Sequence, residues 1–367
     1  MKKKIAFVCP RSPREDYAGI ENYVLNLTKE LKKFYDIEIF CTAKNPTKGA
    51  RINGIPLLEF KEEKMPFGIH YYSNELISSL KKSNADIIHA CGYNTMAPLM
   101  SLIAKKREQK LVITLASSKS SSPVRELLEN AHSVLIKALS KKVDCFIAIS
   151  RFEKSIFEKK FNNRFCIIPV AHNRLKLGYV PKKEKQVITI GRLTKNKGFH
   201  FVIDAFNELI KMDGKFNLVI VGDGPYKDTL QKQVETYNLL DKVKFTGMIP
   251  RQNYKKLLRL LKESTAFVFL SSYDSPALIV EEAIFTKTPT IVANTSAIKE
   301  FAECKLATAF EQTESRKIAE KIIEISKNPK KFEPKEKDIK NCYLIKNWAE
   351  VRDQTIKVYN TVLKEKN

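Results

Sequence analysis

The sequence lacks any long uninterrupted apolar run. No stretch approaches the roughly 18 residues that indicate a membrane-spanning helix. The chain begins with Met1 and three lysines that lead straight into a strand-like segment, where a secretory leader would place an apolar one. We therefore expect a cytoplasmic protein, with a peripheral position on the inner face of the cell membrane as an open alternative.

Paired cysteine motifs are also missing. The seven cysteines are scattered without a C-x-x-C spacing, and most lie in apolar, strand-like segments. A free cysteine behaves as a small buried hydrophobe, whereas disulfide frameworks and zinc sites show clustered spacings. We interpret all seven as reduced core residues and expect no metal site. They are Cys9, Cys41, Cys91, Cys145, Cys166, Cys304 and Cys342.

No RNA-recognition, zinc-finger or aromatic base-stacking signature accompanies the basic charge. The net charge is +24, and the excess of lysine and arginine is spread over both halves of the chain. Such a field attracts nucleic acid, anionic lipid headgroups or phosphorylated substrates without choosing among them. Dispersed lysines most often form a solvated protein surface. Binding to an anionic membrane surface is the more specific alternative interpretation. We expect no nucleic-acid partner and keep a basic nucleic-acid-binding protein as a remote alternative.

Two domains suit the length of the chain. A chain of 367 residues is longer than a domain with a single hydrophobic core usually is, and its 43% hydrophobic content is enough to fill two cores. Short apolar segments alternate with helically spaced apolar positions, a pattern typical of parallel sheets covered by helices. We predict an α/β protein with Rossmann-like domains at 1–172 and 185–345, joined by a linker at 173–184. The tail, from about residue 339 to 363, predicts one or two amphipathic helices.

The strand predictions follow from these apolar segments. In the first domain they are 4–9, 37–42, 55–60, 86–90, 111–115, 144–149 and 165–169. In the second they are 185–190, 216–221, 243–246, 266–270, 290–293 and 306–310.

A strand, a loop and a helix start follow one another near residue 276. Pro276 suits a first helical turn because its missing N–H would have no acceptor there. The free amides of Ala277 and Leu278 should then face the end of the preceding strand, where a helix N-terminus can bind an anion. The sequence thus predicts a site for an anionic ligand at this point.

Two carboxylates flank those amides. Asp274 lies on the loop, and Glu282 is placed about two turns into the helix, close enough for both to face one ligand. A nucleotide-sugar fits, because its anionic diphosphate lies between two hydroxyl-rich sugars.

Three motifs carry a family resemblance. Asp274 and Glu282, with seven residues between them, resemble the E-x7-E motif of retaining GT-B glycosyltransferases, most closely family 4 (group 1). The turn 191–198, at the end of a strand, resembles the family's G-R-L-x-x-x-K-G. Residues 19–21 resemble the end of its G-G-x-E loop, with Ala18 where the first glycine is usual.

The resemblance implies a GT-B fold and a donor site. Two Rossmann-like domains would face a central cleft, with acceptors bound by the first domain and the nucleotide-sugar by the second. A C-terminal helix, about 346–367, would cross back onto the first domain. No metal or other cofactor is implied, since Arg192 and Lys197 would hold the donor diphosphate as two cations. Gly19 would present amides to the phosphates.

The remaining roles follow from the chemistry. Glu282 would accept the ribose hydroxyls, and Asp274 would orient the transferred sugar. The amides of Ala277 and Leu278 would contact the donor. The catalytic set is therefore Asp274, Glu282, Arg192 and Lys197, and the donor-binding set is Gly19, Arg192, Lys197, Ala277, Leu278 and Glu282.

Several positions depart from the family pattern. Ala116 stands where a histidine commonly reaches the transferred sugar. Ser275, Pro276 and Ala277 replace a glycine-rich turn, and Ala297 replaces a later glycine. Each added Cβ crowds the approach of backbone to phosphate.

Three function classes remain. The leading interpretation is a retaining hexosyltransferase that moves a sugar from a nucleotide-sugar to a glycan or lipid-linked acceptor. A non-catalytic GT-B scaffold or nucleotide-sugar-binding protein is the alternative within the fold, and nucleic-acid binding is the remote one. His172, which lies where relatives have a different loop, could take a polar role.

Overall fold

The chain divides into two compact units in the computed structural model. It describes residues 2–15, 19–63, 71–116, 123–172, 175, 177–183, 185–275 and 277–364. The first unit comprises Met1–Ala171 together with Lys346–Asn367, and the second comprises His172–Ile345. His172, which the sequence analysis placed at the end of the first domain, therefore begins the second unit.

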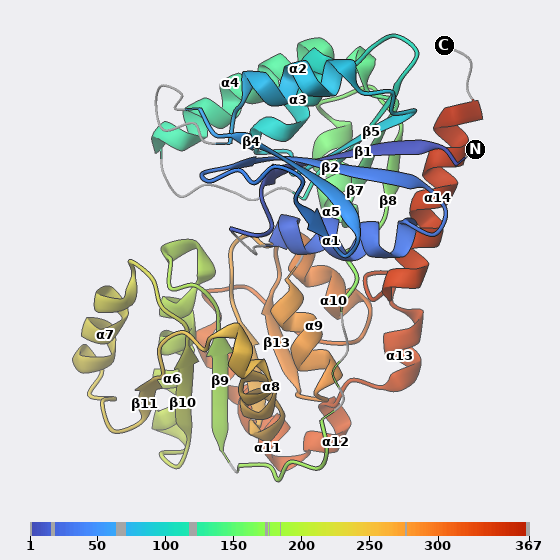
Figure 1. The fold of residues 1–367 in the computed structure, drawn as a ribbon. Helices are drawn as coiled ribbons and strands as arrows, with labels where there is room; N and C mark the ends of the chain where they lie inside the picture. Colours follow the sequence, from blue (N-terminus) through green and yellow to red (C-terminus); the bar gives the residue numbers. More distant parts are fainter. Residues whose placement is uncertain are drawn as a thin grey trace. The chain divides into compact units, whose positions relative to one another are not determined.

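The first unit is built on one sheet (Figure 1). Its strand order is β3-β4-β2-β1-β5-β6-β7-β8, parallel throughout except for the β3–β4 pair. The strands are β1 (Lys4–Arg11), β2 (Asp36–Ala43), β3 (Arg51–Ile52), β4 (Ile55–Lys61), β5 (Ile87–Cys91), β6 (Lys110–Thr114), β7 (Cys145–Ala148) and β8 (Phe165–Ile167). The helices are α1 (Gly19–Leu31), α2 (Asn74–Lys82), α3 (Met96–Ala104), α4 (Pro123–Leu139), α5 (Arg151–Glu158) and α14 (Trp348–Lys364), with the 3₁₀ helix η2 (Ser140–Lys142).

Local chemistry explains where several of these helices begin. Ser73, Thr95 and Ser150 precede α2, α3 and α5, and each side-chain oxygen accepts a hydrogen bond from a first-turn amide. The strands between them, β5, β6 and β7, are buried at every position, as expected for parallel strands covered on both faces. β1 shows this pattern, because its interior residues are all buried.

A buried polar contact anchors the C-terminal helix within the first unit. α14 packs beside α1 (Figure 1). The fully buried hydroxyl of Tyr359 on α14 lies 2.6 Å from Nδ1 of His89 on β5. The other ring nitrogen of His89 lies 2.7 Å from Oγ1 of Thr114 on β6. This chain of hydrogen bonds fixes the helix to the middle of the sheet.

The second unit is built on a sheet of order β11-β10-β9-β12-β13-β14, parallel throughout. The strands are β9 (Gln186–Ile190), β10 (Asn217–Val221), β11 (Val243–Phe245), β12 (Ala266–Phe269), β13 (Thr290–Ala293) and β14 (Thr308–Phe310). The helices are α6 (Phe199–Met212), α7 (Lys227–Thr236), α8 (Tyr254–Glu263), α9 (Leu278–Phe285), α10 (Glu300–Glu303), α11 (Ser315–Lys327), α12 (Pro329–Phe332) and α13 (Glu336–Asn341). The 3₁₀ helices are η3 (Lys195–Lys197), η4 (Arg251–Asn253) and η5 (Ser296–Lys299).

Both sheets reverse their strand order beside their first strand. In the first unit β1 lies between β2 and β5, and in the second β9 lies between β10 and β12. Loops that leave the two strands at such a switch point diverge and open a crevice at the carboxyl ends, where α/β proteins bind ligands. Two candidate places for ligands are thus defined, one in each unit.

Each predicted strand is present, with ends displaced by no more than two residues. The short antiparallel strand β3 was not predicted, because two residues carry no periodicity. The helix that follows β12 begins at Leu278, so Glu282 lies about one turn into α9 and not two. Pro276 and Ala18 lie outside the described residues.

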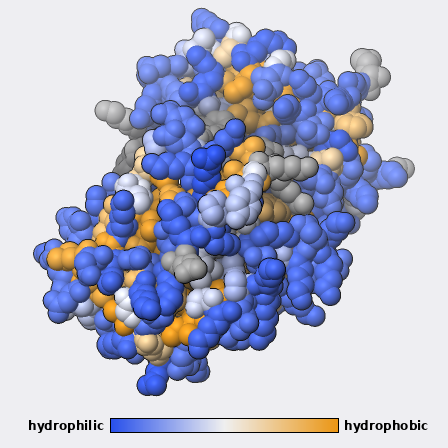
Figure 2. All heavy atoms as spheres, turned by 90° about the horizontal axis from the view of Figure 1, so that it is seen from below, coloured by the Kyte–Doolittle hydropathy of each residue, from blue (hydrophilic) through white to orange (hydrophobic). Residues whose placement is uncertain are grey.

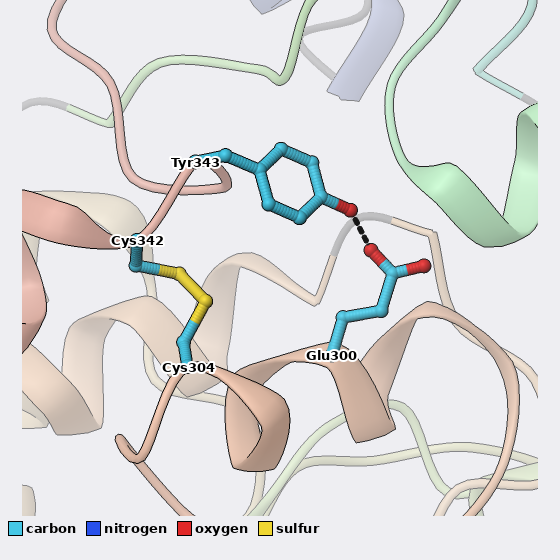
Figure 3. Close-up of a disulfide and its surroundings, with 4 residues drawn as sticks. All are labelled: Glu300, Cys304, Cys342 and Tyr343. Carbon is cyan, nitrogen blue, oxygen red and sulfur yellow. Dashed lines mark hydrogen bonds between the residues drawn. A yellow bond between two sulfur atoms is a disulfide. The ribbon is translucent and has the colours of Figure 1, made fainter.

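The expectation of seven reduced cysteines is wrong for one pair. Cys304 and Cys342 form a disulfide that joins the ends of α10 and α13 (Figure 3). The adjoining Tyr343 points its hydroxyl at Glu300 and donates a hydrogen bond to Oε2 of that residue. The two cysteines are 38 positions apart, and no sequence spacing marks them as partners. The other five cysteines are free.

Hydrophilic residues cover most of the face shown in Figure 2, and apolar residues appear there in patches. None of the helices in the described residues is long and apolar enough to cross a membrane.

Candidate functional site

The site of the second unit forms where the loops after β9 and β12 meet. Nζ of Lys197, on η3, lies 2.5 Å from Oδ2 of Asp274, on the loop after β12. The backbone N–H of Ser272 donates to the carbonyl oxygen of Asn196 over 2.8 Å. The hydroxyl of Ser271 donates to the same carbonyl over 3.2 Å. Both loops are therefore tied together at the switch point of the sheet.

Gly198 makes this close approach possible. It has φ +69°, a left-handed conformation that residues with a side chain rarely adopt. A Cβ at this position would lie 1.9 Å from the carbonyl oxygen of Leu270, the residue after β12. The turn of η3 can thus rest directly on the end of the neighbouring strand only with glycine here.

Burial and a paired cation act in opposite directions on Asp274. Burial raises the pKa of the Asp274 carboxyl, and the Lys197 ammonium and a hydrogen bond with Ser271 lower it. The net shift is upward. The protonated, neutral form of Asp274 is therefore more accessible than it would be for an exposed aspartate.

Arg192 is a cation left open to a ligand at the end of β9. Its side chain is exposed, and among the described residues no carboxylate forms an ion pair with it. Lys197 is already neutralised by Asp274. The two cations that the sequence analysis expected to hold the diphosphate together therefore differ in this respect.

Glu282 is held by two side chains distant in sequence. Its Oε1 accepts a hydrogen bond of 2.7 Å from the hydroxyl of Tyr254, at the start of α8. Nε2 of His172 lies 3.3 Å from the same oxygen and 3.3 Å from the Tyr254 hydroxyl. The Glu282 carboxylate is thus fixed through one oxygen. We name His172, Tyr254 and Glu282 the Glu282 clamp.

The sequence analysis missed Tyr254 and gave His172 only an open polar role. No motif could have shown either, because the three members of the clamp are separated by 82 and 28 positions.

The amides expected to bind the anion lie at the start of α9. Ala277 is the residue before the helix, and Leu278 is its first residue. The first N–H groups of any helix have no acceptor within the helix. In the same site, the backbone N–H of Asp274 donates a hydrogen bond to the hydroxyl oxygen of Ser296, over 3.3 Å.

Gly19 belongs to the first unit, where it is the first residue of α1. A Cβ placed on Gly19 would meet no atom within 4 Å. Ala116, also in the first unit, follows β6 with φ +40°. Ala297 is buried within η5 of the second unit.

No group of three or more His, Cys, Asp and Glu side chains in the described residues has the arrangement of a metal site.

Two family models match this chain in succession. The model of Glycosyltransferase Family 4 matches residues 17–173, and that of Glycosyl transferases group 1 matches residues 178–342. The alpha-monoglucosyldiacylglycerol synthase of Streptococcus pneumoniae is 29% identical over 168 residues, which are 46% of this chain and 35% of that protein. The chain spans less than two thirds of the length of the curated relatives that it matches first.

Solved structures share the fold over nearly the whole chain. Sucrose-phosphate synthase from Thermosynechococcus elongatus superposes with a TM-score of 0.77 at 17% identity, covering 98% of this chain and 99% of that one. Anabaena HepE in complex with UDP-glucose superposes with a TM-score of 0.69 at 17% identity, covering 98% and 99%. Two Rossmann-like units of this kind define a GT-B protein. The chain belongs to the glycosyltransferases that join a family 4 domain to a group 1 domain.

Proposed function

We propose that the protein transfers a sugar from a nucleotide-sugar to a glycan or lipid-linked acceptor with retention of configuration. The observation that carries the proposal is the open guanidinium of Arg192 at the switch point, beside the loop of Asp274. A planar guanidinium can bind a diphosphate through two parallel hydrogen bonds. HepE, in complex with UDP-glucose, supports a UDP-sugar as the donor.

Each residue of the site has a role in this reaction. Arg192 binds the diphosphate and stabilises the charge that develops as the sugar leaves. Lys197 moves from Asp274 to the phosphate when the donor enters, so two cations serve and no metal is required. Asp274 is then free to accept a hydroxyl of the transferred sugar.

The Glu282 clamp supplies the remaining contact with the donor. Tyr254 and His172 hold Oε1 of Glu282, which leaves the second oxygen to accept the ribose hydroxyls. In the transfer step the bond from the anomeric carbon to the phosphate oxygen breaks. The acceptor oxygen bonds to the same face of that carbon, and its proton passes to the departing phosphate.

Calorimetry with UDP, GDP and ADP and their glucose derivatives tests the donor site. One nucleotide should bind the wild type, and Arg192→Ala and Glu282→Ala should each weaken it at least tenfold. Arg259→Ala is the matched control, because Arg259 is an exposed arginine on α8 of the same unit. Equal binding by Arg192→Ala and Arg259→Ala would contradict the proposal.

Product analysis separates transfer from binding alone. The anomeric configuration of the product, read by NMR, should match that of the donor. Nucleotide binding without turnover on any acceptor tested would favour the non-catalytic alternative, which the neutralised Lys197 and the departures at Ala116 and Ala277 support.

A further inference from the structure

Two free cysteines lie side by side at one end of the first sheet. Cys145 begins β7, and Cys166 is the middle residue of β8. The two strands pair in parallel with Ile147 opposite Cys166. Side chains two residues apart on a strand share a face, so Cys145 and Cys166 lie on the same face of the sheet.

The two sulfur atoms are 3.7 Å apart, and the Cys145 thiol donates a hydrogen bond to the Cys166 sulfur. The carbonyl oxygen of Phe146, 3.5 Å from the same thiol, is an alternative acceptor for that proton. A disulfide bond is about 2.05 Å long, so the sulfurs need to approach each other by only about 1.7 Å to form one. The pair is therefore placed for a reaction between its own two sulfurs.

Cys166 is the accessible member of the pair. β8 is the last strand in the order of the sheet, and each of its three residues is partly exposed. Cys145 is fully buried, as is Cys91 on β5. A small solute that approaches from solvent therefore reaches Cys166 first, and Cys145 lies behind it.

Nearby groups favour the thiolate form of Cys166. The hydrogen bond from Cys145 and the positive charges of Arg164 and Lys154 lower the pKa of the Cys166 thiol, and burial opposes them. The net shift is downward. At Cys91 burial raises the pKa of the thiol instead. Because the thiolate is the nucleophilic form of cysteine, Cys166 combines reactivity with access, and Cys91 has neither.

We propose that Cys145 and Cys166 form a peroxide-reactive dithiol, in which Cys166 is the sulfur that attacks the peroxide and Cys145 is the sulfur that resolves the product. The inference is independent of sugar transfer, because both residues lie in the first unit and neither has a role in the donor site. It assigns a modification site to the end of the sheet formed by β7 and β8.

The reaction takes place in two steps. The Cys166 thiolate attacks one oxygen of hydrogen peroxide, the O–O bond breaks, and hydroxide leaves, so that Cys166 becomes a sulfenic acid. The Cys145 sulfur then attacks the Cys166 sulfur, and the S–O bond breaks. The proton of the Cys145 thiol leaves with the departing hydroxide as water. Two electrons pass from the two thiols to the peroxide, and a disulfide remains.

Thiol counting and peptide mapping of the folded, full-length protein test the inference. The unreduced protein has five free cysteines among those described, and oxidation of one pair would leave three. Equimolar hydrogen peroxide, quenched before denaturation, should therefore lower the thiol count by two. Mapping under non-reducing conditions should find a peptide that joins Cys145 to Cys166, beside the one that joins Cys304 to Cys342.

Three variants separate the roles of the two sulfurs. Cys145→Ser should stop at the sulfenic acid, which dimedone traps on Cys166. Cys166→Ser should consume peroxide at least tenfold more slowly than the wild type. Cys91→Ser is the matched control, because Cys91 is a free cysteine of the same sheet, and it should form the Cys145–Cys166 bond as fast as the wild type does.

Three outcomes would overturn the inference. The first is that the thiol count of the wild type stays unchanged, a result that does not depend on whether any variant folds. The second is that the oxidised thiols map to Cys9, Cys41 or Cys91. The third is that Cys166 forms a disulfide between two molecules, visible as a dimer on a non-reducing gel, because Cys145 would then not resolve it.

Discussion

Nζ of Lys197 lies 2.5 Å from Oδ2 of Asp274, so a cation and an anion to which the sequence assigned separate roles form a salt bridge. The pair joins the loops that follow β9 and β12, the two strands at the switch point of the second sheet. In the proposed reaction, a diphosphate competes with Asp274 for Lys197. Occupancy of the site and the state of this salt bridge are therefore coupled.

Asp274→Asn should strengthen UDP binding several-fold while it reduces sugar transfer by at least tenfold. The substitution removes a negative charge beside the proposed diphosphate site and releases Lys197, but it also removes the carboxylate that we propose accepts a sugar hydroxyl. Calorimetry and a transfer assay measure the two effects. Asp213→Asn is the control, because Asp213 pairs with Lys185 over 2.6 Å in the same unit, away from the site. Weaker UDP binding by Asp274→Asn would refute the competition.

The same salt bridge predicts a pH effect on UDP affinity. Burial raises the pKa of Asp274, and protonation cancels the charge that holds Lys197. Affinity for UDP should therefore rise as the pH falls through that raised pKa, beyond the change that titration of UDP itself causes. Asp274→Asn should lack the additional rise. A parallel pH dependence in the two proteins would contradict this assignment.

Tyr254→Phe should weaken donor binding about fivefold, because one hydrogen bond that fixes Glu282 is worth about 1 kcal/mol. Glu282→Gln should cost more, since it removes the charge as well. Tyr237→Phe is the matched control: the Tyr237 hydroxyl also donates to a carboxylate, Oδ1 of Asp204, over 2.8 Å. If both Tyr→Phe variants bind UDP equally, the Glu282 clamp does not position the donor.

Gly198→Ala should destabilise the second unit far more than Gly247→Ala. Both residues have left-handed φ values, +69° and +73°, so each variant pays about 1–2 kcal/mol of backbone strain. Only Gly198 adds a clash, with the carbonyl oxygen of Leu270, whereas Gly247 has open space. Thermal unfolding by circular dichroism measures the difference. Equal losses of stability in the two variants would mean that the loops after β9 and β12 can separate without destabilising the unit.

Reduction of the Cys304–Cys342 disulfide should lower the free energy of unfolding by about 4 kcal/mol, as the chain-entropy relation gives for a loop of 38 residues. Cys304→Ser should reproduce the loss. Cys166→Ser should not, because Cys166 is a free cysteine whose sulfur only accepts a hydrogen bond from the Cys145 thiol, over 3.7 Å. Thiol titration of the unreduced, denatured protein should find five free thiols. Seven would contradict the disulfide.

The first unit should lose stability as the pH falls below about 6.5, the usual pKa of an exposed histidine. Burial lowers the pKa of His89 to about 3. Between these values the unfolded chain binds a proton that the folded chain does not, so the free energy of unfolding falls by up to about 1.4 kcal/mol per pH unit. Urea unfolding, followed by fluorescence of the single Trp348, reports on this unit. His89→Gln should show a smaller slope, and His172→Gln should keep it.

The sequence by itself determined the strands, the family and most of the residues at the second switch point. Parallel strands that are buried on both faces are mostly apolar, so they can be recognised in the sequence. The Arg192 turn and the Asp274–Glu282 pair are each contained in a short segment of the chain, so they can be recognised there too. The motifs around Arg192 and Asp274 were therefore visible before the fold.

Only the tertiary structure decided which side chains meet. Tyr254 and His172 reach Glu282 from distant positions, and the bond between Cys304 and Cys342 closes a loop that no spacing marks. Such contacts depend on how the sheet orders its strands, and a linear pattern does not contain that order.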